Sequence, residues 1–135
     1  MAIIDDLGQL PIFAEVGPAE LAALAKYAEE RDVAAGEELT HEGKHEGSVF
    51  VVLTGSVEIQ RDGRSVDTIG PGGFFGEIAA IDGGPRTATG RALQDSRVVV
   101  VSPRQFNDVL DASPDLQAAV MAEMERRLAR IDAGT

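Results

Sequence analysis

The chain has 135 residues, which is enough for one compact domain with a hydrophobic core. Its formal net charge of −11 provides no basic surface for nucleic acid, and the absence of cysteine excludes disulfides and thiolate metal sites. We find no signal-peptide pattern and no apolar run long enough to cross a bilayer. The sequence therefore predicts a cytoplasmic protein that binds neither nucleic acid nor a membrane.

Residues 1–30 carry helical patterns. Ile3 to Phe13 has apolar residues at near-helical spacing and predicts a short amphipathic segment. Gly17-Pro18 predicts the start of a second helix that continues to Glu30, because proline suits the first turn. The apolar face of this second helix consists of Leu21, Leu24, Ala25 and Ala28. We expect a small helical module over these residues.

Short runs rich in β-forming residues follow from Arg31 onward, separated by recurring glycines. Asp62-Gly63, between two of these runs, is a strong signal for a hairpin turn. Many short strands with turns between them are typical of an antiparallel barrel or sandwich, which we expect over residues 31–102. The predicted strands are residues 48–53, 56–61, 65–69 and 95–101.

His41-Glu42-Gly43-Lys44-His45 matches the H-E-x-x-H pattern of zinc metalloproteases. That pattern needs a helix, which places both histidines on one face. Gly43 lies inside the segment and β-like runs surround it, so the segment does not favour a helix. We predict an exposed polar turn between strands and no metal site.

The stretch from Phe74 to Ala92, FFGEIAAIDGGPRTATGRA, combines the features of a phosphate and sugar cradle. Gly76 opens a short helical turn, and the free N–H groups at a helix start attract an anion. Arg86 adds a planar fork of donors that suits a phosphate, and Thr87 adds a hydroxyl. Glu77 repels a phosphate but can accept hydrogen bonds from the hydroxyls of a neighbouring sugar. Together these groups describe a nucleotide site.

Two helices are predicted after the last strand, over residues 103–132. Ser102-Pro103 is a cap and first-turn signal, and Ser113-Pro114 repeats it. The final helix is expected from Pro114 to about Ile131, and Glu123 and Arg127 form a favourable i,i+4 pair on it. Its apolar stripe consists of Leu116, Val120, Met124, Leu128 and Ile131, with Ala119 beside it.

The stretch from Phe74 to Ala92 resembles the phosphate-binding cassette of the cyclic nucleotide-binding domain family. That cassette reads F-G-E-[LI]-[AG]-[AL] and then P-R-[STA]-A-[TN]. The matching residues are Phe75-Gly76-Glu77-Ile78-Ala79-Ala80 and Pro85-Arg86-Thr87-Ala88-Thr89. The resemblance implies a mainly β fold with flanking helices. The expected core is an antiparallel double-stranded β-helix (a jelly-roll-like β-roll), with N-terminal helices and a C-terminal helical lid. It also implies that residues 1–135 form a single domain, with the phosphate-binding cassette at 75–89 inside the roll.

The resemblance further implies a regulatory sensor for a cyclic purine mononucleotide, with cAMP favoured over cGMP, and no enzymatic activity. In the family the arginine pairs with the cyclic phosphate and the glutamate takes the ribose 2′-hydroxyl, and here these are Arg86 and Glu77. The hydroxyl after the arginine, Thr87, often adds a contact, although it does not decide the base. The expected ligand-binding residues are Gly76, Glu77, Ile78, Ala79, Arg86, Thr87 and Ala88.

In this family the last helix folds over the base, and its motion is the output. The resemblance therefore implies an unidentified protein effector, and self-association of the last helix into a homodimer is one alternative. The residues that could cap the base are Met124, Arg127, Leu128 and Ile131. Arginine can stack on a ring by cation–π contact. We expect a stand-alone sensor rather than a fragment.

Two other hypotheses stay open. The first is a structural or interaction domain that keeps the fold and responds to no nucleotide. The second is a metal-dependent enzyme with a cupin-like barrel that uses His41 and His45. Cupin metals usually take more histidine or carboxylate ligands than this pair can gather.

Overall fold

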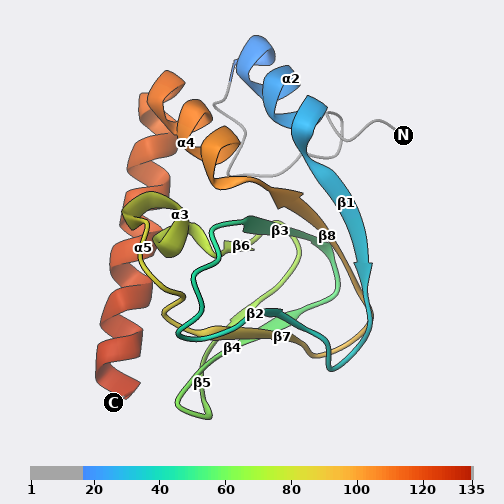
Figure 1. Ribbon diagram of the computed structural model, residues 1–135, viewed down its shortest axis with the longest axis vertical. Helices are drawn as coiled ribbons and strands as arrows, with labels where there is room; N and C mark the ends of the chain where they lie inside the picture. Colours follow the sequence, from blue (N-terminus) through green and yellow to red (C-terminus); the bar gives the residue numbers. More distant parts are fainter. Residues whose placement is uncertain (1–16, 135) are drawn as a thin grey trace.

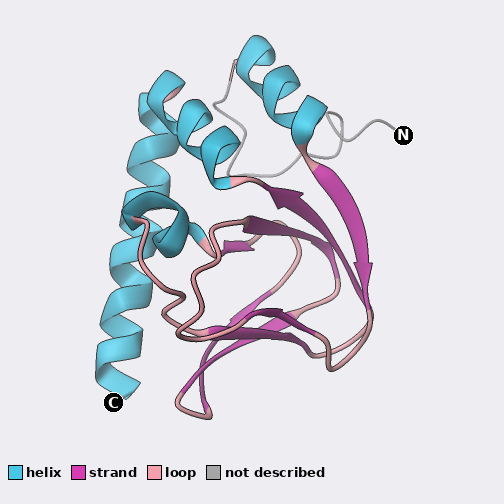
Figure 2. Ribbon diagram, viewed as in Figure 1, coloured by secondary structure: helices cyan, strands magenta, loops and turns pink. Residues whose placement is uncertain are grey.

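A computed structural model describes residues 17–134 of the chain. The predicted segment from Ile3 to Phe13 lies outside these residues. Two four-stranded antiparallel sheets form a roll, and helices cover one side and one end of it (Figure 1; Figure 2). The expected mainly β fold, a β-roll with flanking helices, is confirmed.

The first sheet has the strand order β1-β8-β3-β6 and is covered on both faces. Val49 and Val51 of β3 pack against the helices, whereas Phe50 and Val52, which alternate with them, pack between the sheets. Phe74 and Phe75 divide in the same way. Burial on both faces explains the unbroken valine runs of this sheet. Its strands are β1 (Glu29–Val33), β3 (Val49–Thr54), β6 (Phe74–Phe75) and β8 (Ser96–Val101).

The second sheet has the strand order β2-β7-β4-β5. The predicted hairpin joins β4 and β5, where Arg61 pairs with Arg64 and the two turn residues have positive φ angles, 52° at Asp62 and 78° at Gly63. Positive φ at both positions is what a two-residue turn between twisted strands requires. The strands are β2 (Glu38–Thr40), β4 (Val57–Arg61), β5 (Arg64–Ile69) and β7 (Thr89–Ala92).

Four helices lie within the described residues: α2 (Pro18–Tyr27), α3 (Glu77–Asp82), α4 (Pro103–Ala112) and α5 (Pro114–Gly134). The cap predicted for α4 is confirmed, because Ser102 accepts a hydrogen bond from the Gln105 N–H at 3.2 Å. The long helix α5 runs along the side of the roll with α3 beside it (Figure 1). Leu116 and Val120 of its predicted stripe are buried, whereas Leu128 is exposed.

Three features of the fold differ from the predictions. The helix predicted to reach Glu30 ends at Tyr27, and Glu29 and Glu30 instead pair with Val100 and Val99 of β8. The short strands β2 and β6 were not predicted. The sequence pattern also predicts a strand-like run that begins at Arg86 and Thr87, whereas the strand β7 begins only at Thr89. In each case pairing with a distant strand, rather than local composition, decides the conformation.

Candidate functional site

A pocket opens between the two sheets, beside α3 and α5, and measures about 510 Å³ including the part open to solvent. The structure brings together all the residues predicted for the site: Gly76, Glu77, Ile78, Ala79, Arg86, Thr87 and Ala88 line the pocket. Phe75, the first residue of the cassette motif, and Arg127 of α5, one of the candidates to cap the base, also line the pocket. Sequence reasoning did not find the remaining lining residues, which are Thr40, Ile59, Val66 and Asp67.

Gly76 is the N-cap of α3 and brings the backbone close to Arg86. Its φ is +92°, and a Cβ at this position would lie 2.6 Å from the Ser48 carbonyl oxygen and 2.8 Å from Nη1 of Arg86. Both the left-handed conformation and the close approach require glycine. The local turn of the cassette is thus dictated by the sequence itself.

Arg86 is buried and held in place by several groups. Its Nη1 donates to the Gly76 carbonyl at 3.1 Å and its Nη2 to the Ser48 carbonyl at 2.8 Å. Its backbone exchanges two hydrogen bonds of 2.9 Å with Gly43 and Lys44. Burial lowers the pKa of Arg86 from its usual range, although Glu46 opposes this effect. The guanidinium is therefore a fixed cation in the wall of the pocket.

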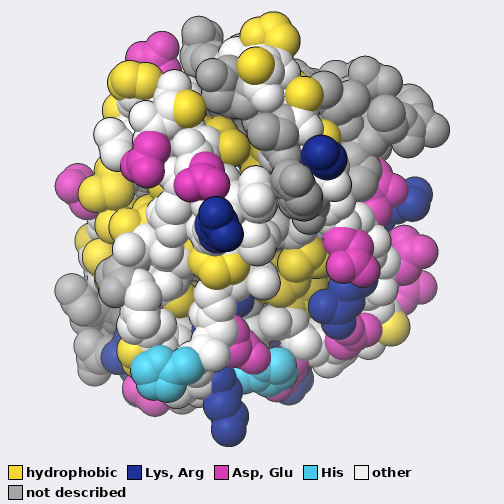
Figure 3. Space-filling model, turned by 45° about the horizontal axis from the view of Figure 1, so that its top comes forward, with side chains coloured by type: hydrophobic (Ala, Val, Ile, Leu, Met, Phe, Trp, Pro, Cys, Tyr) yellow, Lys and Arg dark blue, Asp and Glu magenta, His cyan; other side chains and the backbone are white. Residues whose placement is uncertain are grey.

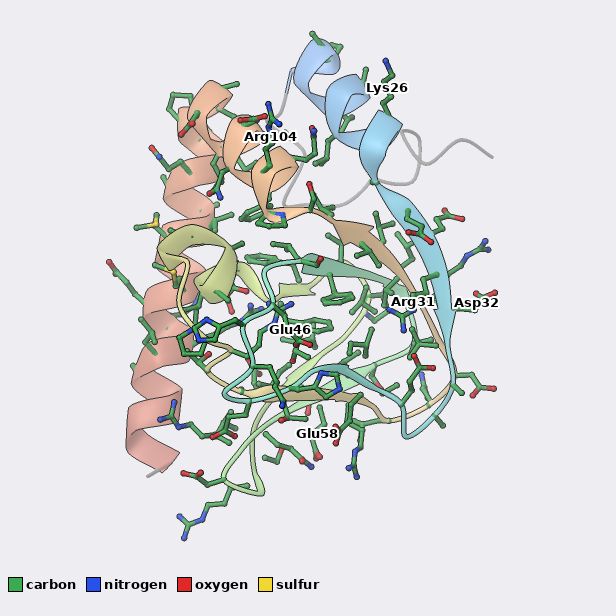
Figure 4. The ribbon with its side chains drawn as sticks, in the orientation of Figure 1. Lys26, Arg31, Asp32, Glu46, Glu58 and Arg104 are labelled. Atoms are coloured by element: carbon green, nitrogen blue, oxygen red, sulfur yellow. The ribbon has the colours of Figure 1, made fainter. Side chains whose placement is uncertain are left out.

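Glu46, on the connection between β2 and β3, is the carboxylate partner of Arg86. Its Oε1 lies 3.4 Å from Nε of Arg86. In Figure 4, Glu46 is labelled below and to the right of α3. The bonds to Glu46, Gly76 and Ser48 engage three of the five N–H groups that a guanidinium carries. Sequence reasoning missed this contact.

The segment His41 to His45 forms a turn between β2 and β3, as predicted, and not the helix that the metalloprotease pattern needs. His41 contacts Glu46, with 3.0 Å between Nδ1 and Oε2, and His45 is exposed. Among residues 17–134, we find no cluster of three or more histidine or acidic side chains that could hold a metal ion.

Glu77, the other polar residue of the cassette, is paired with the last helix. Its side chain is 1% exposed, and its Oε1 accepts a hydrogen bond of 2.6 Å from Nη1 of Arg127. Burial raises the pKa of Glu77, and the charge of Arg127 works against this rise. Arg127 also lies over the ring of Phe74, with 4.8 Å between Cζ and the ring centroid. The predicted pair between Glu123 and Arg127 is present at 3.3 Å.

The rest of the pocket wall is apolar. Ile59 and Val66 come from the hairpin β4–β5, and Phe75 faces them from β6. The ring of Phe75 stacks on that of Phe50 with 5.1 Å between centroids. The pocket therefore offers a cation for an anion, a buried carboxylate for a hydrogen-bond donor and an apolar wall for a planar ring.

One family model matches more than half of the chain, and several known proteins are similar to most of it. Residues 30–113 match the family model described as the cyclic nucleotide-binding domain. An NTE family protein of Mycobacterium tuberculosis is 33% identical over 123 residues, which cover 90% of this chain and 21% of that protein. A CRP-like cAMP-activated global transcriptional regulator of the same species is 29% identical over 129 residues, which cover 92% of this chain and 58% of the regulator.

A solved structure shares the fold. Cyclic AMP-bound PfPKA-R has a TM-score of 0.87 with this chain at 22% identity, over 96% of this chain and 45% of that one. Of the two mycobacterial relatives, the chain spans about a fifth of the NTE family protein and just over half of the regulator. Within the part of the chain that the structure describes, no helix is both long and apolar enough to span a bilayer.

Proposed function

The chain belongs to the cyclic nucleotide-binding domain family, and from that premise we propose that it binds a cyclic purine mononucleotide and acts as a regulatory sensor. The observation that carries this proposal is that Arg86, Glu77 and several apolar side chains line the same pocket. A cyclic nucleotide presents the matching groups in one rigid molecule: a phosphate anion, a ribose 2′-hydroxyl and a flat base.

In the proposed complex, Arg86 binds the cyclic phosphate through the N–H groups that Glu46, Gly76 and Ser48 do not use. The hydroxyl of Thr87 adds a donor. Glu77 accepts a hydrogen bond from the 2′-hydroxyl, and the backbone of Gly76, Ile78, Ala79 and Ala88 completes the cradle. The side chains of Ile59, Val66 and Phe75 contact the apolar faces of the ligand.

We favour cAMP over cGMP. The support comes from the relatives, since the mycobacterial regulator is described as cAMP-activated and PfPKA-R was solved with cAMP bound. A ligand series that compares the two nucleotides directly decides this point.

The contact between Arg127 and Glu77 supports a role of α5 as the moving element. The charged residues that line the pocket are two carboxylates, Asp67 and Glu77, and two arginines, Arg86 and Arg127, so their charges balance while α5 is docked. If α5 moves away and takes Arg127 out of the pocket, the three charged lining residues that remain have a net negative charge, which opposes the binding of an anion. Phosphate binding and docking of α5 therefore favour each other, and by linkage the ligand shifts the helix toward the docked state.

Isothermal titration calorimetry with cAMP, cGMP, AMP and 2′-deoxy-cAMP tests the site. Replacing Arg86 by alanine should weaken cAMP binding by about 3 kcal/mol, or roughly 150-fold, because the phosphate loses a buried charged donor. The matched control is Arg97→Ala, which removes an exposed arginine of β8 that is paired with Glu30 away from the pocket. 2′-Deoxy-cAMP should bind more weakly than cAMP to the unchanged chain. Glu77→Ala removes the acceptor for the 2′-hydroxyl, so this variant should bind cAMP and 2′-deoxy-cAMP equally.

One observation favours the alternative of a ligand-free interaction domain: Arg86 and Glu77 already have partners within the chain. That alternative predicts no heat of binding with any of the four nucleotides. Four points remain predictions. These are the cytoplasmic location, a protein effector that responds to the position of α5, a homodimer formed through this helix, and the expectation that residues 1–135 form a single domain.

A further inference from the structure

His41 is the outer end of a chain of polar contacts that reaches Arg86. Its Nδ1 lies 3.0 Å from Oε2 of Glu46, and its backbone N–H donates to Oε1 of the same carboxylate at 3.1 Å. The same Oε1 lies 3.4 Å from Nε of Arg86. Glu46 is therefore fixed by His41 on one side and orients the guanidinium on the other.

This chain of contacts leads from solvent to the pocket wall. The side chains of His41 and Glu46 are 45% and 35% exposed, whereas that of Arg86 is 3% exposed. Figure 3 shows both histidines at the molecular surface, in cyan. The imidazole can therefore exchange a proton with solvent while it remains in contact with the carboxylate that holds Arg86.

Carboxylates face the imidazole from two elements. Glu46 comes from the connection between β2 and β3, and Glu38 of β2 lies 3.8 Å from Nε2. Glu38 is also paired with Arg91 of β7 at 3.0 Å. Partial burial works against ionisation of Glu46, but hydrogen bonds from His41 and Arg86 outweigh it and lower the pKa of Glu46. Glu46 is therefore held in its charged form beside the imidazole.

We propose that His41 is a positioning residue that acts through Glu46 on Arg86 and makes the binding of a cyclic phosphate stronger when the imidazole is protonated. The inference rests on the proposed function of the pocket. A neutral imidazole leaves the full charge of Glu46 to act on Arg86 and to repel the phosphate. A protonated imidazole balances Glu46, so that the positive field of Arg86 acts on the phosphate. By linkage, phosphate binding also favours protonation of His41.

Calorimetric titration with cAMP between about pH 5.5 and about pH 8, the range in which histidine titrates, tests this role. The cyclic phosphodiester keeps one negative charge throughout, so the ligand adds no titration of its own. The unchanged chain should bind about fivefold more tightly at the acid end, which is the lower limit of ordinary coupling because both linking side chains are partly exposed. It should also take up protons on binding, measured as a dependence of the binding heat on the ionisation enthalpy of the buffer.

His41→Gln keeps a hydrogen-bonding side chain and cannot be protonated, so it should lose most of this pH dependence and the proton uptake. Glu46→Gln removes the link and should give the same result. The matched control is His45→Gln, because the chain has only two histidines and His45 is exposed on the same turn. Any pH dependence from the buried Glu77 persists in all these variants. The role of His41 is therefore measured as the difference in pH dependence between the unchanged chain and His41→Gln.

Three outcomes would overturn the inference. If the unchanged chain and His41→Gln show the same pH dependence, His41 has no role in binding. If His45→Gln removes the effect, the wrong histidine is assigned. Tight but pH-independent binding rejects the role of His41 and leaves the proposed function standing, whereas no binding at any pH rejects both.

Discussion

Replacing Arg127 by methionine should expose how strongly α5 is held on the cassette. Methionine keeps an apolar contact with Phe74 and removes the charge that neutralises Glu77, whose side chain is 1% exposed. Removing one partner of a buried ion pair costs about 3–5 kcal/mol, because the other charge is left uncompensated. We therefore expect a loss of this size in the free energy of unfolding near neutral pH, measured by urea denaturation with far-UV circular dichroism, since the chain has no tryptophan.

The loss should depend on pH with a definite sign. Burial raises the pKa of Glu77 above its ordinary value of 4.5, so the folded chain retains a proton that the unfolded chain has already released. The free energy of unfolding therefore falls as pH rises from the pKa of Glu77 in the unfolded chain to its higher pKa in the folded chain. Without Arg127 the folded-state pKa is higher still, so this pH window extends further upward. Each pH unit of it is worth about 1.4 kcal/mol. The variant should lose more stability at about pH 8 than at about pH 5, as expected for an uncompensated carboxylate.

Two further variants separate this effect from a general weakening of α5. Arg126→Met is the matched control, because Arg126 is the exposed neighbour of Arg127 and should cost at most about 0.5 kcal/mol. Glu77→Gln combined with Arg127→Met removes both charges and should recover most of the stability and abolish the added pH dependence. Equal losses in the Arg126 and Arg127 variants, or no recovery in the double variant, would refute the reasoning.

Two glycine substitutions and one cap substitution test other parts of the structure. Gly76→Ala should cost several kcal/mol and should also reduce cAMP affinity, because its Cβ would lie 2.8 Å from Nη1 of Arg86. Gly63→Ala, which also has positive φ but open space around it, should cost about 1 kcal/mol by urea denaturation and leave cAMP affinity unchanged. Ser102→Ala removes the cap of α4 and should lower stability by about 1 kcal/mol without changing binding.

The cassette could be predicted from the sequence because its parts are close together along the chain. Gly76, Glu77 and Arg86 lie within one short turn, helix and loop, and the left-handed φ of Gly76 is available at low cost only to glycine. The hairpin at Asp62-Gly63 and the cap at Ser102 are equally local. Family resemblance then linked this local pattern to a ligand, which composition and spacing alone do not identify.

The partners of the two charged cassette residues could not be predicted in the same way. Glu46 lies 40 residues from Arg86 along the chain, and Arg127 lies 50 residues from Glu77. No local pattern encodes these contacts, because they form only when the sheets roll up and α5 docks against α3. The same reason explains the error at Glu29 and Glu30, which were predicted to end a helix and which instead pair with Val100 and Val99 of β8.

The sequence by itself determined the chemistry available at the site, namely one arginine, one glutamate and a glycine turn in register, together with the β-forming runs that build the sheets. Only the tertiary structure decided the electrostatic state of that chemistry. Burial raises the pKa of Glu77 and makes it depend on Arg127, while Glu46 ties Arg86 to the surface residue His41. Buried charges interact strongly over short distances, so the behaviour of this site depends on which side chains the fold brings into contact.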